Sequence, residues 1–421
     1  MDSQKKWVRL LFVLMLCSIV SAEDRSCKYI LKTDSPLVAS TPLYIDLEDV
    51  NFNTDTQRIA LYRLDSAAKS PIPCQLETGH TARLWFMLDT PVSANTEVTY
   101  EIAFENARAS QSPMTVSIDA NTITLGREGK NILSYYTAIH DVPNGVSPLY
   151  RRSGFIHPLW SPAGNIMTCI QPPDHYHHYG IWNPWTKTQV EGKEVDFWNL
   201  AKGDGTVRFA GVLSTVSGPV YAGYKVRQEH VVLKPHPKVA MNEVSDVRAY
   251  AGKVNGKLVW LIDYTSIIND ALETPINLDD YRYGGGIGYR ATEKWNRDNS
   301  AVLTSEGKTR KDADGNCARW CDISGSFGDS NNTSGIVFFS HPANRKHPEP
   351  IRLWPPDVND GNGAIFFNFC PIRIEGWSIE PQKEYTLRYR MIVYDGKIDA
   401  KTIEVLWQSY ARTPVITRKI N

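Results

Sequence analysis

The feature that most constrains the fold of this chain is the alternation of apolar and polar residues in short runs. Near the C-terminus, Tyr385, Leu387, Tyr389 and Met391 alternate with polar residues. A period of two residues places successive side chains on opposite faces of an extended strand, so one face packs and the other is polar. A helical pattern is confined to residues 401–410. The chain is therefore predicted to be an all-β protein.

The strand-like runs fall into two sets, which fits two domains in a chain of 421 residues. Short runs punctuated by prolines predict a small immunoglobulin-like β-sandwich over residues 23–115. Longer runs predict a larger sandwich domain over residues 116–421, and the polar segment 106–113 forms the linker. Strands are predicted at residues 29–31, 43–45, 59–62, 84–88, 98–104, 122–125, 207–210, 224–233, 258–268, 336–339, 365–369 and 385–394.

The polar faces of the longer runs carry arginine, glutamate and tyrosine. Thr386, Arg388 and Arg390 form such a face on the last run. Two explanations are open, the floor of a polar cleft and plain exposure to solvent. The glycine-rich stretch 284–288 has no helix pattern after it, so it predicts a turn, a bulge or a close approach to bare backbone rather than a nucleotide site.

The N-terminus has the pattern of a secretory signal peptide over residues 1–22. Lys5, Lys6 and Arg9 precede the apolar run 10–20, and a small-residue cleavage site follows it. The apolar run is too short for a comfortable membrane span. We therefore predict a periplasmic or secreted protein with no integral membrane association.

Cysteine usage and charge narrow the class of protein further. Six cysteines lie beyond the signal peptide, and an even number in an oxidising compartment permits disulfides, for example Cys27 with Cys74 or Cys317 with Cys321. The formal net charge is +0 and no long basic run occurs, which argues against nucleic acid as a partner. The chain has 12 Trp and 20 Tyr, residues that fill β cores and also stack on sugar rings.

The loop at residues 171–182 concentrates the chemistry. It places Asp174, His175, His177 and His178 between two prolines and a glycine. Imidazoles exchange protons near neutral pH, and a neighbouring carboxylate orients a ring or shares the proton work. In an extended chain, His175 and His177 would point the same way and His178 the opposite way.

Other candidates complete the predicted site. The candidate catalytic residues are His157, Asp174, His175, His177, His178 and Glu375. The candidate substrate-binding residues are tryptophans that stack on a sugar, arginines that bind a uronate carboxylate, and two further histidines: Trp182, Trp198, Trp377, Arg290, Arg345, Arg373, His341 and His347. The alternative for any single histidine is a structural bond to a loop carbonyl. No cofactor is predicted; the metal alternative is a divalent ion on His157, His175 and His177, although their spacing matches no standard zinc signature.

Several stretches of the chain, covering roughly residues 120–396, are similar to the bacterial DUF6807 family, whose members are often labelled methane oxygenase PmoA. The stretches are Gly154–Gly164, Pro173–Trp182, Gly192–Trp198, His341–Pro348 and Tyr385–Arg390. The resemblance implies a sandwich akin to galactose mutarotase, found in bacteria that degrade plant and host glycans. It also implies neighbouring enzymes that oxidise sugars or process keto-sugars.

Together these features predict an exported carbohydrate-active protein with a carbohydrate substrate. The favoured function is a hydrolase or lyase that uses histidine and aspartate as acid and base in a concave β-sheet cleft, on a glycoside or a keto-sugar. The alternatives are a glycan-binding module without turnover, an aldose epimerase and a metal-dependent oxidoreductase.

Overall fold

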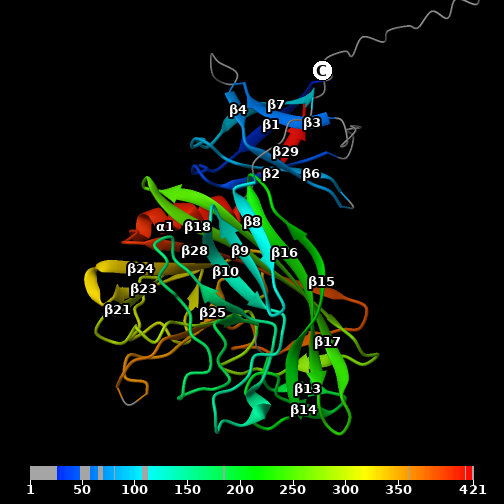
Figure 1. The fold of residues 1–421 in the computed structure, drawn as a ribbon, viewed down its shortest axis with the longest axis vertical. Coiled ribbons are helices and arrows are strands. Elements are labelled where there is room, and N and C mark those ends of the chain that lie inside the picture. The colour runs from blue at the N-terminus through cyan, green and yellow to red at the C-terminus, as the bar shows by residue number, and fades with distance from the viewer. Residues whose placement is uncertain are drawn as a thin grey trace, which may run out of the picture.

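The computed structural model describes residues 26–47, 57–64, 70–79, 81–106, 112–183, 185–359, 361–412 and 414–419. The predicted signal peptide and residues 107–111 of the predicted linker lie outside these ranges. The described residues form a small β unit stacked on a larger one (Figure 1). The prediction of an all-β protein is confirmed, while the likeness to galactose mutarotase and the export of the chain stay predictions.

The small unit is a sandwich of two antiparallel sheets around one apolar core. Its five-stranded sheet has the order β29 (Ile416–Arg418), β1 (Cys27–Thr33), β7 (Thr96–Asn106), β3 (Gln57–Arg63) and β4 (Ser70–Ile72). Its three-stranded sheet has the order β2 (Pro42–Asp46), β6 (Arg83–Met87) and β5 (Cys74–Glu77). The first described strand therefore pairs with the last described one, in the register Leu31 with Ile416.

The larger unit contains two large antiparallel sheets with a core of buried side chains between them. The nine-stranded sheet has the order β22 (Cys317–Ala318), β25 (Glu349–Leu353), β26 (Phe366–Phe369), β20 (Ile287–Arg290), β12 (Ile181–Trp182), β11 (Ile156–Leu159), β10 (Lys130–Tyr136), β9 (Thr122–Arg127) and β8 (Met114–Ile118). The eight-stranded sheet has the order β15 (Gly205–Val216), β16 (Tyr221–Val232), β17 (Lys238–Val254), β18 (Lys257–Asp270), β28 (Glu384–Asp395), β24 (Asp329–Ser340), β23 (Trp320–Phe327) and β21 (Ser300–Thr304).

Smaller elements complete the larger unit. A four-stranded sheet has the order β14 (Lys193–Val195), β13 (Thr188–Val190), β19 (Ile276–Leu278) and β27 (Trp377–Ile379). A short 3₁₀ turn covers Pro148–Tyr150. The predicted C-terminal helix is confirmed as α1 (Ala400–Ala411), which begins where the Asp399 side chain accepts a hydrogen bond from the Thr402 N–H. Among the described residues, no helix has the length and apolarity that crossing a bilayer requires.

The two faces of the eight-stranded sheet pack differently. Leu387, Tyr389 and Met391 of β28 face the main core, as the alternation predicts. The opposite face is covered by α1 and by the small unit, whose Trp85 packs at 5.8 Å on Tyr221. The outer face of the sheet is therefore a contact surface between units and not simply a solvated one.

Two sequence expectations, on the glycine-rich stretch and on the cysteines, can be compared with the structure. The glycine-rich stretch is approached closely by the protein itself, because a Cβ on Gly285 would lie 1.9 Å from the Trp185 ring. The six described cysteines are not joined in disulfides. The division at residue 115 stays a prediction; β8 runs across it, and β29 belongs to the sheet of the small unit.

A buried acid, Glu349 on β25, makes stability depend on pH. Its carboxyl accepts hydrogen bonds from the Asn344 amide (2.9 Å) and the Tyr389 hydroxyl (2.9 Å). Burial raises the pKa of Glu349 to about 7, and the hydrogen bonds lower it only in part. The unfolded carboxyl titrates at about 4.3, so between about pH 4.3 and pH 7 the native state holds a proton that the unfolded state has lost. Stability therefore falls as the pH rises through this window.

In the unaltered chain, the unfolding free energy should fall between about pH 5 and about pH 8. In Glu349→Gln this fall should be smaller by about 2–3 kcal/mol. Urea titrations at both pH values measure this difference. Glu384→Gln, at an exposed position at the start of β28, is the matched control and should leave the fall unchanged. An unaltered fall in Glu349→Gln would show that this carboxyl is ionised in the native protein.

Candidate functional site

The histidine loop is a tight turn rather than an extended segment. The His178 N–H donates to the His175 carbonyl (3.0 Å), and the Gln171 N–H donates to the His178 carbonyl (2.8 Å). The ring centroids of His175, His177 and His178 consequently lie 4.7–5.3 Å from one another. The prediction that His178 points away from the other two was wrong, because it assumed an extended backbone.

Gly180 fixes the loop against the nine-stranded sheet. Its φ is +58°, and a Cβ at this position would lie 2.2 Å from the Ile156 carbonyl oxygen. A side chain is therefore excluded both by the conformation and by the space. The tight contact places the loop directly beside β11.

Asp174 is the centre of the hydrogen bonds in this loop. Its carboxylate accepts from Arg290 Nη2 (2.9 and 2.8 Å), from His175 Nδ1 (2.8 Å) and from Asn359 Nδ2 (2.7 Å). Burial alone would raise the pKa of Asp174. The hydrogen bond from His175 and the charge of Arg290 outweigh that effect and hold its pKa well below the ordinary value. Asp174 is therefore an ionised carboxylate throughout the neutral range.

Arg290, at the end of β20, is almost completely buried, with 2% of its surface exposed. Its guanidinium lies 4.9 Å from the centre of the Trp354 ring, and its Nη1 lies 3.5 Å from His178 Nδ1. A buried guanidinium needs a counter-charge, and Asp174 provides it. Arg290 therefore positions Asp174 through Nη2, and its predicted binding of a substrate carboxylate stays a prediction.

Aromatic side chains enclose the inner end of the cluster. The ring of His178 lies within 5.0–6.2 Å of four buried aromatic rings, those of Trp182, Trp198, Trp354 and Phe366. Two of these tryptophans, Trp182 and Trp198, were predicted to stack on a substrate. Both are only 1–2% exposed, so they pack against the histidines instead.

The three imidazoles of the loop differ in their burial and in their hydrogen bonds. Burial, together with the neighbouring His175, lowers the pKa of His177 to about 4. Burial holds the pKa of His178 well below its ordinary value. Both rings are therefore neutral at pH 7. His175 uses Nδ1 on Asp174, and its Nε2 has no hydrogen-bond partner among the described residues.

Two predicted catalytic residues form their hydrogen bonds or ion pairs with residues outside this cluster. The His157 ring is bonded through Nδ1 to the Thr168 hydroxyl (2.9 Å), and burial lowers its pKa to about 4. Glu375 is exposed and forms ion pairs with Arg345 (3.2 Å) and Lys346. A surface ion pair of this kind leaves Glu375 without a place in the histidine cluster.

The remaining predicted binding residues are distributed over other parts of the larger unit. Arg373 binds Asp314 (3.1 Å), and Arg345 lies over the ring of Trp377. His347 stacks on Trp407 of α1, and His341 lies against Tyr410. Spacing along the chain could not reveal these separate partners. Within the described ranges, no three His, Cys, Asp or Glu side chains are placed to hold a metal ion, and His157 is bonded away from the ring cluster.

Two members of the cluster were not identified from the sequence. Asn359 donates to Asp174, and Trp354 lies 4.6 Å from the His175 ring. Both belong to the connection after β25, more than 170 residues from the loop. Two prolines follow Trp354 and indicate a rigid loop, but nothing in this stretch indicated that it contacts the histidine loop.

A family model described as "Family of unknown function (DUF6807)" matches residues 122–408. The match covers most of the chain, including the histidine loop, Arg290 and Asn359. The chain belongs to this family. A comparison with curated proteins gives no match.

The solved structures that match this chain are distant from it in sequence and in structure. An alpha-mannosidase from Enterococcus faecalis V583 is 7% identical with a TM-score of 0.41; the alignment covers 94% of this chain and 46% of that one. A protein from Synechocystis sp. PCC 6803 is 11% identical with a TM-score of 0.29, over 69% of this chain and 100% of that one. An alpha-galactosidase from Lactobacillus brevis is 10% identical with a TM-score of 0.24, over 70% of this chain and 42% of that one. The chain thus spans about half the length of the mannosidase.

Proposed function

We propose that the chain is an exported carbohydrate-active enzyme, a hydrolase or a lyase, with its active site at Asp174, His175 and His177. The observation that carries the proposal is the bond of 2.8 Å between Asp174 Oδ2 and His175 Nδ1, beside a second imidazole whose ring centroid is 5.3 Å away. A carboxylate that fixes one ring nitrogen leaves the other nitrogen aimed and available as a base.

In this proposal His175 is the general base. Its Nε2 takes a proton from water in hydrolysis, or from a carbon beside a keto group in elimination. In both cases the glycosidic C–O bond breaks, and the departing oxygen takes the proton back from the imidazolium and leaves as an alcohol. The Asp174 carboxylate stabilises the imidazolium that forms, and Arg290 and Asn359 keep the carboxylate in place. His177 is neutral, so it both donates to and accepts from a sugar hydroxyl.

Partial exposure is what lets the pair act on a substrate. The side chains of His175 and Asp174 are 31% and 26% exposed, whereas Arg290 and Trp354 behind them are buried. His175 and Asp174 are thus accessible to a substrate, while the buried Arg290 and Trp354 hold them in place. Acid–base groups need this combination of access and fixed position.

The experiment is a substrate screen followed by matched variants. Purified protein is incubated with plant and host glycans and with their C3-oxidised forms, and products are followed by mass spectrometry. In hydrolysis, the summed mass of the two products exceeds the mass of the substrate by one water. In elimination, the summed mass equals that of the substrate, and one product is unsaturated. For the substrate found, His175→Gln and His177→Gln should lower kcat/KM by about 10²–10⁴-fold with the fold intact. The exposed His236→Gln is the control and should retain full activity.

Binding without turnover across the whole panel would overturn the assignment as an enzyme and favour a glycan-binding module. Interconversion of anomers without bond cleavage would overturn hydrolase and lyase in favour of an epimerase. Full activity in both histidine variants would exclude this loop as the reactive site.

A further inference from the structure

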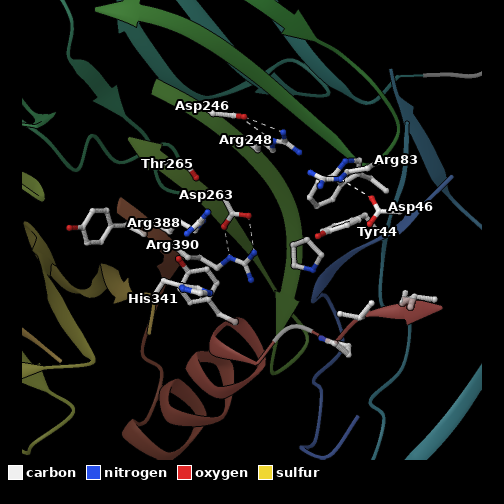
Figure 2. A pocket seen from close by; sticks show the side chains of 17 residues that line it. Tyr44, Asp46, Arg83, Asp246, Arg248, Asp263, Thr265, His341, Arg388 and Arg390 are labelled. Atoms are coloured by element: carbon white, nitrogen blue, oxygen red, sulfur yellow. Dashed lines mark hydrogen bonds and ion pairs between the residues drawn. The ribbon is translucent and has the colours of Figure 1, made fainter. Parts of the chain in front are cut away.

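A polar cavity lies between the two units, on the outer face of the eight-stranded sheet. Its volume is about 410 Å³, within the range of small-molecule sites. The small unit, the loop after β24 and the segment leading into β29 form its other walls (Figure 2). The histidine cluster is held on the nine-stranded sheet, so the cavity is a separate place on the molecule.

Among the described residues, four arginines line the cavity, and three of them are already paired with aspartates. The pairs are Arg83 with Asp46 (Nε to Oδ1, 3.0 Å), Arg248 with Asp246 (Nε to Oδ1, 3.2 Å) and Arg390 with Asp263 (Nη2 to Oδ2, 2.8 Å). These pairs cancel most of the lining charge and leave one arginine in excess. The balance suits a ligand with a single negative charge rather than a dianion, which the three aspartates would repel.

The arginine in excess is Arg388 on β28. It is exposed, and its guanidinium has no partner among the described residues. The Thr265 side chain lies beside it, because the two residues are directly opposite in the pairing of β18 with β28. The Thr265 hydroxyl also has no partner within the described part of the chain. Two neighbouring donors therefore face the cavity unmatched.

His341 adds a third donor from the loop after β24. Its Nδ1 accepts from the Ala343 N–H (3.1 Å), which places the ring proton on Nε2. Burial, with the nearby Arg388, lowers the pKa of His341 to about 4, so the ring is neutral at pH 7. It donates a hydrogen bond without adding charge.

The wall opposite these donors is partly apolar. Pro42 and Tyr44 of the small unit and Val415 before β29 line it, and Val415 is 75% exposed. Rings and aliphatic side chains pack against the C–H faces of sugars. The cavity thus combines an unmatched cation, carboxylates that accept hydroxyl protons, and an apolar wall.

We propose that this cavity is a binding site for an acidic sugar, a uronate residue of a glycan, whose carboxylate binds Arg388 and Thr265 while its ring lies against the small unit. Paired aspartates accept hydrogen bonds from its hydroxyls, and His341 donates to a ring or hydroxyl oxygen. The site does not depend on any chemistry at the histidine loop.

Calorimetric titration with methyl glucuronide and methyl glucoside tests the proposal, because the two ligands differ only in the carboxylate. We expect methyl glucuronide to bind the full chain at least about 10-fold more tightly than methyl glucoside, since a charged hydrogen-bond pair contributes roughly that factor. Arg388→Ala should remove the difference between the two ligands. Thr265→Val, which keeps the shape and removes one donor, should weaken methyl glucuronide binding several-fold.

Arg227→Ala is the matched control, since Arg227 is exposed on β16 of the same sheet and does not line the cavity. It should bind methyl glucuronide as the unaltered chain does. Equal affinity for the two sugars, or unchanged binding in Arg388→Ala, would overturn the proposal. Acetate or phosphate binding as tightly as methyl glucuronide would overturn the assignment to a sugar.

Discussion

Replacing His230 by leucine is expected to lower the free energy of unfolding by about 3–5 kcal/mol. His230 Nε2 lies 2.9 Å from Glu243 Oε2, and neither side chain has any exposed surface. Burial alone would raise the pKa of Glu243, but the hydrogen bond and charge of His230 lower it below the ordinary value. Without the histidine, a carboxylate would remain in the core with only Asn183 and Ser266 as donors.

The pairing itself is isolated by a second variant. In His230→Leu combined with Glu243→Gln, the glutamine oxygen still accepts from Asn183 and Ser266 but carries no charge. This double variant should be more stable than His230→Leu alone by about 1–3 kcal/mol. Chemical denaturation measures the unfolding free energies of the single and the double variant, with the same m-value for both. His236→Leu, in the exposed turn between β16 and β17, should change stability by less than about 0.5 kcal/mol.

A loss below about 1 kcal/mol in His230→Leu would mean that Glu243 is neutral in the core or reached by water. The double variant would then have no advantage over the single one. Either result would contradict an ionised Glu243 that His230 stabilises in the core.

Asp174→Asn is expected to be the second large effect, a loss of about 3 kcal/mol in the free energy of unfolding. The change keeps the shape of the side chain but removes the counter-charge of the buried Arg290. The carboxylate has a native pKa below its unfolded value of about 3.9, so its stabilisation is present above that pH and is lost as the pH falls further. The difference between the variant and the unaltered chain should therefore shrink in acid.

The control for this prediction is another aspartate–arginine pair. Asp141 lies 2.9 Å from Arg151, nearly the same separation, but the two side chains are 78% and 51% exposed. Asp141→Asn should cost less than about 1 kcal/mol because solvent screens an exposed pair. Equal losses in the two variants would show that burial of Arg290 has no part in the effect.

The fold was predictable where one strand face is uniformly apolar. The alternation of Tyr385, Leu387, Tyr389 and Met391 predicted β28 with its correct inner face. The longest strand within the described ranges, β17, was missed. Its inward positions include Glu243 and Ser245, so the apolar alternation is broken by the buried polar network that these residues form.

The site was predictable only within the local sequence. Asp174 and three histidines follow one another along the loop, and a turn was enough to bring them together. Arg290 and Asn359 come from 116 and 185 residues away, so their bonds to Asp174 depend on the order of the strands in the sheet. The polar face with Arg388 and Arg390 proved to line a cavity, which depended on where the small unit packs.

The pairing of β29 with β1 has a consequence for biosynthesis. β1, the first strand in the described part of the chain, finds one of its two neighbours only when residues 416–418 have been made. Until then that edge of the small sheet is unpaired, and an unpaired edge strand can pair with strands of other chains. The five-stranded sheet of the small unit is therefore complete only after the larger unit has been synthesised. A chaperone that covers this unpaired edge during translation would prevent such intermolecular pairing.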